Sequence, residues 1–370
     1  MRKLIISLFL IILLLCIGGT VGLTLYLSYK DHIADHQFPL NQKWVFEADR
    51  QIGSAPVVYK NFVLFRTYDR LYVVNAETGE MEWSYFLSKD NYTDPPLVQD
   101  NSVILTHLKG TTALDLSTGE VLWDVFDDNT RVDTVPVVSN QDIVVIVDKD
   151  ILIRDLDTGE LLWKVQNPYG RSNAVVGLDN DTLYVVFRDE MHSYNIQTGE
   201  RLWHKPTEEW SLGPGISGLF TGGVWFLELK EGGLAAYSVD DKKILWRRED
   251  LSLKHYPITQ NEDTLFISTR GSVPVALEAT TGKTKWEAND LSDYDDYQTP
   301  LIFDNKVYIR GLFKKKIYSL DINNGNLFGQ ISLGIPDLIS NNASYSLGPV
   351  QYNGLIIFPA GNKLLAYGNY

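Results

Sequence analysis

Four aspartates lie within seven residues of one another, at Asp290, Asp293, Asp295 and Asp296. Carboxylate oxygens are the ligands that Ca²⁺ and other hard cations require. Their spacing does not match the twelve-residue loop of an EF-hand, which places ligands at alternate positions around a glycine. A solvated acidic loop is therefore the favoured interpretation. A calorimetric Ca²⁺ titration would test the alternative of a cation site.

The six histidines do not form a catalytic or metal-binding pattern. They are His32, His36, His107, His192, His204 and His255. The first two have the i, i+4 spacing of paired ligands, but no third ligand lies near them. The other four fall in different repeats, with no HExxH motif and no nucleophile–histidine–acid arrangement. We therefore expect no catalytic, cofactor-binding or metal-binding residue, no bound cofactor and no enzymatic activity.

The composition disfavours nucleic-acid binding and excludes internal disulfide bonds and multi-thiolate zinc sites. Lys and Arg number 33 against 47 Asp and Glu, which gives a net charge of −14. Duplex nucleic-acid binders normally carry a basic footprint, so a nucleic-acid partner is not expected. Cys16 is the only cysteine, which excludes a disulfide framework and a zinc site built on several thiolates.

An internal repeat of about 40 residues must position all of these side chains. The clearest copy, ALDLSTGEVLW, ends at Trp123. Tryptophans end similar phrases at positions 83, 123, 163, 203, 246 and 286. Alternating apolar residues before the phrase predict a strand, and Asp-x-x-Thr-Gly predicts a tight turn into a second strand that carries the tryptophan. A further hairpin precedes each phrase, as in PVVYKNFVLF at 56–65.

Four short strands per repeat predict the blades of a β-propeller. With SLDINNGNLFG, which offers Phe328 in place of the tryptophan, seven phrases run along the chain. Residues 348–370 supply an eighth unit that lacks its tryptophan strand. The segment around Trp44 resembles that missing strand. We therefore expect an all-β, eight-bladed propeller, closed by pairing of the N- and C-terminal strands and preceded by one transmembrane helix.

The repeated phrase resembles the tryptophan-docking motif of the pyrroloquinoline-quinone (PQQ) repeat superfamily. It is matched in full by Ala113, Asp115, Thr118, Gly119 and Trp123. The resemblance covers essentially all of residues 41–370. It implies that each tryptophan packs between blades against the glycine turn, so that these residues are structural.

The superfamily holds two kinds of protein, which imply different functions. Quinoprotein dehydrogenases bind the quinone and Ca²⁺ in a central funnel, but they are usually much longer than this chain. The other kind is the non-enzymatic β-barrel assembly lipoprotein of Gram-negative outer membranes, which this chain resembles in length, repeat number and lack of cofactor apparatus. The chain departs from it in having no convincing lipobox.

The N-terminus reads as a membrane anchor. Arg2 and Lys3 precede an uncharged run over residues 4–29, which is longer than the ~20 residues that a bilayer core requires. The positive end is expected in the cytoplasm, with the propeller extracellular or periplasmic on a single-pass protein of the cell membrane. A cleaved signal peptide is the alternative. The expected organisation is an anchor at 1–29, a linker at 30–43 and the propeller at 44–370.

The fifth repeat departs most from the others, with three extra residues and two tryptophans outside the motif, Trp210 and Trp225. Exposed aromatic residues on rigid scaffolds often bind partners, so Trp210 is the one candidate partner-binding residue. A repacked core around the insertion is the alternative. The expected function is that of a monomeric, non-catalytic, membrane-anchored scaffold that binds protein partners in the cell envelope. A PQQ- and Ca²⁺-dependent dehydrogenase and a ligand sensor that uses the central funnel remain alternatives.

Overall fold

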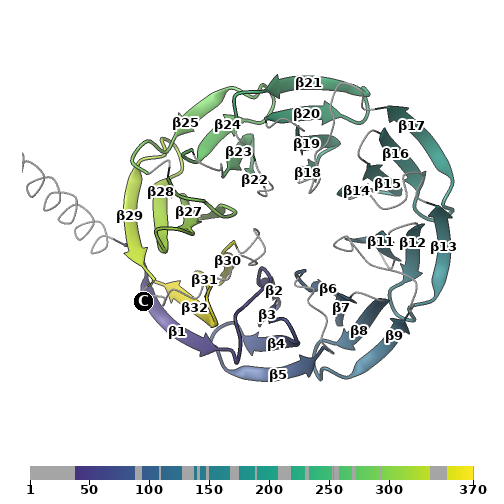
Figure 1. Ribbon diagram of the computed structural model, residues 1–370, viewed down its shortest axis with the longest axis horizontal. Coiled ribbons are helices and arrows are strands. Elements are labelled where there is room, and N and C mark those ends of the chain that lie inside the picture. The colour runs from purple at the N-terminus through teal and green to yellow at the C-terminus, as the bar shows by residue number, and fades with distance from the viewer. Residues whose placement is uncertain are drawn as a thin grey trace, which may run out of the picture.

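The described part of the computed structural model is built entirely of β-strands and turns. It comprises residues 38–87, 94–107, 110–126, 137–139, 142–146, 150–166, 175–187, 190–206, 218–229, 233–251, 253, 258–268, 272–291, 294–333 and 348–369. The strands form eight four-stranded antiparallel sheets, arranged as blades around a central axis (Figure 1). Seven blades are each made of four consecutive strands, and the eighth combines β1 with β30–β32.

The first four blades follow the chain from the inside of the ring outward. Blade one holds β2 (Val57–Tyr59), β3 (Phe62–Arg66), β4 (Arg70–Asn75) and β5 (Met81–Phe86). Blade two holds β6 (Leu97–Gln99), β7 (Ser102–His107), β8 (Gly110–Asp115) and β9 (Val121–Phe126). Blade three holds β10 (Val137–Ser139), β11 (Asp142–Ile146), β12 (Asp150–Asp155) and β13 (Leu161–Gln166). Blade four holds β14 (Val175–Asp179), β15 (Thr182–Val186), β16 (Glu190–Asn195) and β17 (Arg201–Pro206).

The remaining blades complete the ring. Blade five holds β18 (Gly218–Thr221), β19 (Val224–Glu228), β20 (Leu234–Ser238) and β21 (Lys243–Arg248). Blade six holds β22 (Ile258–Asn261), β23 (Thr264–Ile267), β24 (Val275–Glu278) and β25 (Thr284–Glu287). Blade seven holds β26 (Leu301–Phe303), β27 (Lys306–Gly311), β28 (Lys316–Asp321) and β29 (Leu327–Ser332). Blade eight holds β30 (Val350–Tyr352), β31 (Leu355–Ala360), β32 (Lys363–Gly368) and, outermost, β1 (Asn41–Glu47).

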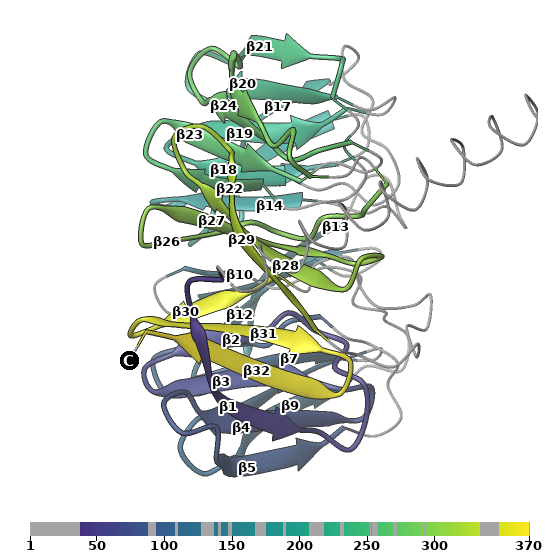
Figure 2. The same cartoon turned by 90° about the vertical axis from the view of Figure 1, so that its left-hand side faces the viewer.

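The antiparallel order gives the ring two different faces. The outer strand of each blade ends on the face where the second strand turns into the third, and we call this side the loop face. The arrowheads of β1, β5 and β21 all point toward it in Figure 2. The opposite side, which we call the turn face, carries the Asp-x-x-Thr-Gly turns. In one such turn the Asp115 carboxylate accepts the backbone N–H groups of Ser117 and Thr118, both at 2.8 Å.

The motif tryptophans join neighbouring blades, as the repeat predicts. The Trp83 indole N–H donates to the Leu116 carbonyl of the next blade at 2.8 Å. Gly119 has a φ of +74°, and a Cβ there would lie 2.7 Å from the Trp83 ring. Six such pairs recur around the ring: Trp44–Gly79, Trp83–Gly119, Trp123–Gly159, Trp163–Gly199, Trp246–Gly282 and Trp286–Gly325. The match to the PQQ-like repeat is therefore confirmed in three dimensions.

Blade five uses a different residue at this contact. Lys242 stands where the other turns have glycine, and it keeps the left-handed backbone with a φ of 54°. Its ammonium lies over the Trp203 ring, 5.2 Å from the ring centroid. The Trp225 side chain is fully buried in the core between blades four and five, 4.9 Å from the Phe220 ring. Repacking of the core therefore accounts for Trp225.

The N-terminal strand closes the ring. β1 pairs antiparallel with β32, and Trp44 lies opposite Ala366. The Trp44 indole N–H donates to the Ala76 carbonyl of blade one at 3.2 Å. Phe38, three residues before the strand, packs edge-on against Tyr367 with the ring centroids 5.9 Å apart. Phe38 and the first residues of β1, which fall in the range that the sequence assigned to a linker, therefore pack against blade eight.

The expectation of an N-terminal transmembrane helix is corrected by the structure. Residues 1–29, which were expected to form it, lie outside the described residues. Within the described part of the chain, no helix has the length and apolar character needed to cross a bilayer. The predicted single-pass localisation in a cell membrane is corrected with it. An uncharged run of sufficient length is necessary for a spanning helix, but it does not establish one.

Candidate functional site

The described aspartates of the acidic cluster have different surroundings in the fold. The Asp290 carboxylate accepts the backbone N–H of Leu327 at 3.0 Å, at the start of β29. Asp295 and Asp296 are buried, and Asp293 lies outside the described residues. Among the residues described, no group of three or more His, Cys, Asp or Glu side chains could hold a metal ion.

Asp295 instead supports the turn between β27 and β28 from below. Its side chain is only 1% exposed, and Oδ1 accepts the backbone N–H groups of Phe313 at 2.8 Å and Lys314 at 3.3 Å. The Tyr318 hydroxyl donates to Oδ2 at 3.4 Å. A Cβ on Gly311 would lie 2.1 Å from that oxygen, so glycine is required there. Burial raises the pKa of the Asp295 carboxyl, and its backbone N–H donors offset part of the rise.

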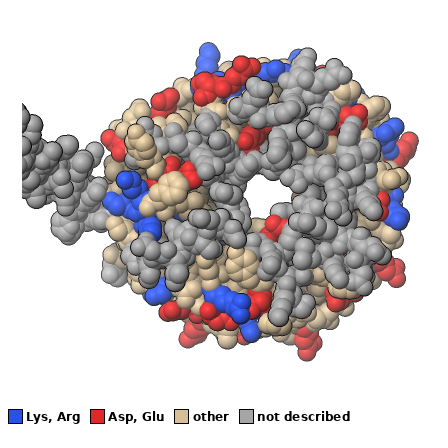
Figure 3. Space-filling view, viewed as in Figure 1, with Lys and Arg blue, Asp and Glu red and all other residues tan. Residues whose placement is uncertain are grey.

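The supported turn presents aromatic and basic side chains on the loop face. We call the group formed by Tyr294 and residues 313–316 the Phe313 turn. Phe313 is 65% exposed and Tyr294 is 82% exposed, and Lys314, Lys315 and Lys316 follow Phe313 in the chain. Backbone hydrogen bonds hold the two segments together, from Leu312 N–H to the Asp296 carbonyl at 2.8 Å and from Gln298 N–H to the Arg310 carbonyl at 2.9 Å. Figure 3 shows blue side chains gathered on the side of the ring where β28 and β29 lie.

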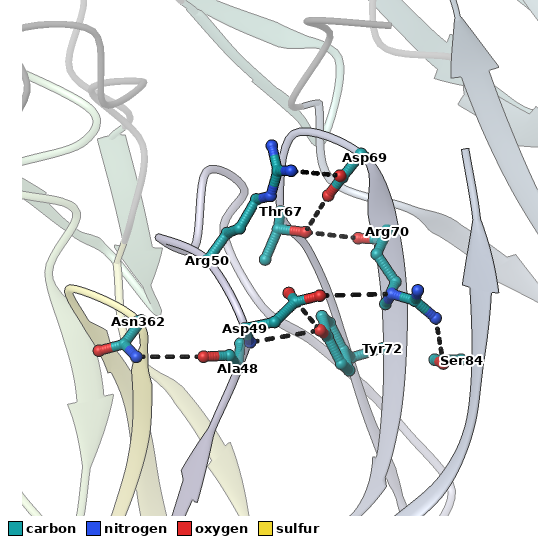
Figure 4. A network of polar contacts seen from close by, with 9 residues as sticks. All are labelled: Ala48, Asp49, Arg50, Thr67, Asp69, Arg70, Tyr72, Ser84 and Asn362. Carbon is teal, nitrogen blue, oxygen red and sulfur yellow. Dashed lines mark hydrogen bonds and ion pairs between the residues drawn. The ribbon is translucent and has the colours of Figure 1, made fainter. Parts of the chain in front are cut away.

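A second tyrosine–aspartate contact occupies the equivalent place in blade one. Tyr72 is the third residue of β4, as Tyr318 is the third residue of β28. Its hydroxyl donates a short hydrogen bond to Asp49, which lies just beyond the end of β1 (Figure 4). Burial, followed by this hydrogen bond, raises the pKa of Tyr72 to about 12. The contact ties the closing strand to the blade that follows it.

The Asp49 carboxylate belongs to a larger polar network at the ring closure. Arg70 Nε lies 3.7 Å from its second oxygen, and Arg70 Nη1 donates to the Ser84 hydroxyl at 3.0 Å (Figure 4). Arg50 pairs with Asp69 at 3.3 Å. Each of these groups has a protein partner, so the network is structural.

Two buried arginines also join neighbouring blades. Arg66 Nη1 donates to the Thr106 carbonyl of blade two at 3.0 Å. Arg310 Nη1 donates to the Pro359 carbonyl of blade eight at 2.7 Å. Burial lowers the pKa of Arg310 to about 10. Both guanidinium groups therefore join neighbouring blades.

His192 and His204 lie opposite each other on β16 and β17 of blade four, with ring centroids 5.8 Å apart, so the expectation of different repeats is wrong for this pair. His107 lies in blade two. His192 is buried, with its Nε2 2.7 Å from the Glu190 carboxylate and its Nδ1 3.0 Å from the Tyr194 hydroxyl. Burial lowers the pKa of His192, and the Glu190 contact opposes that shift. His107 Nε2 lies 3.3 Å from the Thr112 hydroxyl, which donates to Asp124 at 2.7 Å. Neither cluster meets the other, and His32, His36 and His255 lie outside the described residues.

Trp210, the residue predicted from sequence to bind a partner, also lies outside the described residues. Tyr294 and Phe313 were not singled out from the sequence, where Lys314–Lys316 reads as a solvated hairpin turn. The usable signal was Leu312-Phe313 directly before three lysines, because an apolar pair is out of place in a tip that solvent alone would surround.

Comparisons with known proteins support one family. The sequence profile described as outer membrane protein assembly factor BamB matches residues 41–166 and 147–330. No curated protein matches the chain at the level of sequence.

Solved structures share the fold at low sequence identity. BamB from Moraxella catarrhalis is 16% identical, with a TM-score of 0.69 over 89% of this chain and 100% of that one. Quinohemoprotein alcohol dehydrogenase ADHIIG from Pseudomonas putida HK5 is 12% identical, with a TM-score of 0.69 over 89% of this chain and 76% of that one. Sqt1 from Saccharomyces cerevisiae is 10% identical, with a TM-score of 0.67 over 90% and 100%. These likenesses show the fold, whereas the profile covers most of the sequence, and the chain therefore belongs to the BamB family of PQQ-like repeat β-propellers.

Proposed function

We propose that this protein is a non-catalytic scaffold that binds other proteins through the loop face of its propeller. Membership of the BamB family supports an assembly role over a catalytic one. The observation that carries the proposal is the Phe313 turn, where Phe313 and Tyr294 are strongly exposed and a buried carboxylate fixes the backbone of Phe313. Solvent-exposed aromatic residues on a rigid frame are the residues that most often anchor protein interfaces.

Rigidity is the physical reason why a propeller suits this role. Each described blade is joined to the next by buried contacts, including the six tryptophan–glycine pairs. A surface that is already ordered loses little conformational entropy when a partner binds, so more of the contact energy appears as affinity.

Crosslinking in intact cells tests the proposal. A lysine-reactive reagent should join this protein to specific protein partners, and mass spectrometry should map the linked lysines to the loop face, as at Lys314. Lysines of the turn face, such as Lys60 and Lys242, should give few links. Absence of any protein adduct, or equal labelling of both faces, would contradict a scaffold that acts through the loop face.

A quinone-dependent dehydrogenase is the competing function, favoured by the structural likeness to ADHIIG. It is tested separately by dye-linked oxidation of alcohols and sugars with added PQQ and Ca²⁺. The scaffold proposal predicts no turnover above that of a heat-denatured sample. Turnover that depends on both additions would replace the scaffold with an enzyme.

A further inference from the structure

We propose that the Phe313 turn binds an acidic polypeptide segment that carries an aromatic or large aliphatic side chain. This inference rests on the proposed scaffold function and names the chemistry of the partner. It uses two properties of the same few residues, an apolar contact area and a concentration of positive charge.

The apolar half of the site is formed by Phe313 and Tyr294. They come from different segments, one between β27 and β28 and the other between β25 and β26. An isolated bridge between Tyr297 and Gly311 holds these segments in register, together with the backbone bond from Leu312 to Asp296. The two aromatic residues are therefore carried by neighbouring, mutually hydrogen-bonded backbone, and together they can bury one apolar side chain of a partner.

The turn is preorganised by Asp295. Its carboxylate accepts the N–H groups of Phe313 and Lys314, which are the two residues at the tip, and it is itself almost fully buried. An exposed tip would otherwise have to be ordered at the moment of binding, and that cost would subtract from affinity. Asp295 is therefore a positioning residue for this surface.

The charged half of the site is formed by Lys314, Lys315 and Lys316. They stand out on a protein whose net charge is −14, and basic side chains gather in this part of the loop face (Figure 3). Asp295 and Asp296 belong to the segment that pairs with this turn, but both are buried. Lys314 is exposed, and Lys315 and Lys316 are half-buried. The charged side chains of residues 313–316 are thus all basic, and a partner segment with acidic residues beside its apolar anchor is complementary.

Two other polyanions share part of this chemistry. Single-stranded nucleic acid stacks bases on aromatic rings, and anionic lipid attracts lysines. Both need an extended positive surface. Outside the patch of three lysines, the net negative charge of this protein would repel the rest of a long polyanion. A short acidic peptide needs only the local patch, so the observations favour it.

Fluorescence anisotropy with the full chain tests the inference with defined probes. Three labelled peptides of about fifteen residues are compared. One is Glu-rich with a central Phe and Leu, one has Ser in place of the Phe and Leu, and one has Lys in place of every Glu. The first should bind at least about tenfold more tightly than the others, and more weakly as salt rises. A labelled oligothymidine and anionic vesicles should bind more weakly than the first peptide.

Matched variants locate the site. Phe313→Ala should weaken binding of the first peptide by about tenfold or more. Phe328→Ala removes an exposed phenylalanine from the outer strand of the same blade and should leave affinity unchanged. Changing Lys314, Lys315 and Lys316 together to Gln should abolish the salt dependence, whereas Lys60→Gln with Lys242→Gln and Lys283→Gln removes equal charge from the turn face and should not. Circular dichroism and the thermal midpoint confirm that each variant is folded.

The outcomes separate the site from the function. Failure of the acidic peptide to bind, equal binding of the basic peptide, tighter binding of oligothymidine or vesicles, or insensitivity to Phe313→Ala would each overturn the site. If protein adducts still form in intact cells, the scaffold function survives that result. If no adduct forms either, the scaffold function falls as well.

Discussion

Asp295 Oδ1 lies 2.8 Å from the backbone nitrogen of Phe313 and accepts its hydrogen bond from beneath the turn. A buried carboxylate thus fixes the backbone of an aromatic residue whose side chain is 65% exposed. The acidic cluster that resembled a cation site in the sequence has this use in the structure: one of its members replaces solvent for three backbone N–H groups. The geometry makes several predictions about stability and binding.

The ionisation of Asp295 should make folding less favourable at higher pH. Burial raises the pKa of its carboxyl above the ordinary value of 3.8. An acid with a raised folded-state pKa contributes most where both states are protonated, and that contribution is lost as pH rises through the folded pKa. In urea unfolding, wild type should therefore lose stability relative to Asp295→Asn as pH rises from below 3.8. Parallel pH profiles of the two proteins would contradict this.

The Tyr72–Asp49 contact should contribute at neutral pH and fail in alkali. Tyr72→Phe removes a hydrogen bond to a carboxylate, at a cost of about 1.5 kcal/mol in the free energy of unfolding. The pKa of Tyr72 is raised to about 12, so its stabilising share is present below the ordinary tyrosine pKa of about 10 and is lost between there and about 12. Equilibrium unfolding across that range should show the difference between wild type and variant shrinking, and a constant difference would exclude the assignment.

Contact with tryptophan, as distinct from backbone strain, can be measured by two glycine substitutions. Gly119 and Gly222 both have positive φ, but a Cβ on Gly119 would meet Trp83 at 2.7 Å, whereas a Cβ on Gly222 meets nothing within 4 Å. Each change to Ala should cost about 1 kcal/mol through the backbone. Gly119→Ala should cost at least about 1 kcal/mol more because the core must shift. Equal losses on denaturant unfolding would show that the packed tryptophan tolerates the methyl group.

If β1 closes the ring, removing its buried Trp44 side chain should cause a large loss of stability. Trp44 docks on Gly79 and donates to Ala76, so Trp44→Ala should lower the free energy of unfolding by about 3–5 kcal/mol. Val45→Ala, at the exposed neighbouring position on the same strand, should cost under about 1 kcal/mol. A Trp44 variant as stable as the Val45 variant would mean that the ring does not depend on this strand.

Much of the propeller could be predicted because the residues that specify each blade lie close together in the sequence and recur from repeat to repeat. The spacing of Trp83, Trp123 and Trp163 sets the period, and Asp115 with Gly119 specifies a turn by short-range chemistry. The pairing of the strand that carries Trp44 with the last repeat was also predictable, because that repeat lacks its own outer strand.

The site was less predictable because it depends on contacts between segments that the repeat does not encode. Asp295 reads as one acid among four, and only the fold places it under the backbone of Phe313. Tyr294 and Phe313 come from two segments, one connecting blades and one a turn of the next blade, that pair through their backbones at Tyr297 and Gly311. The N-terminal anchor was inferred from a long uncharged run behind Arg2 and Lys3, and nothing in the described residues supports it.

The most direct test is a photo-crosslinking amino acid placed at position 313 in intact cells, with position 328 as the control. Both positions carry an exposed phenylalanine in blade seven, one on the loop face and one on the outer strand. We expect a discrete protein adduct from position 313 and none from position 328. The adduct should map to an acidic segment of the partner and disappear when Lys314, Lys315 and Lys316 are changed to Gln. Adducts from 328 alone, or none from 313, would contradict a partner-binding surface at the Phe313 turn.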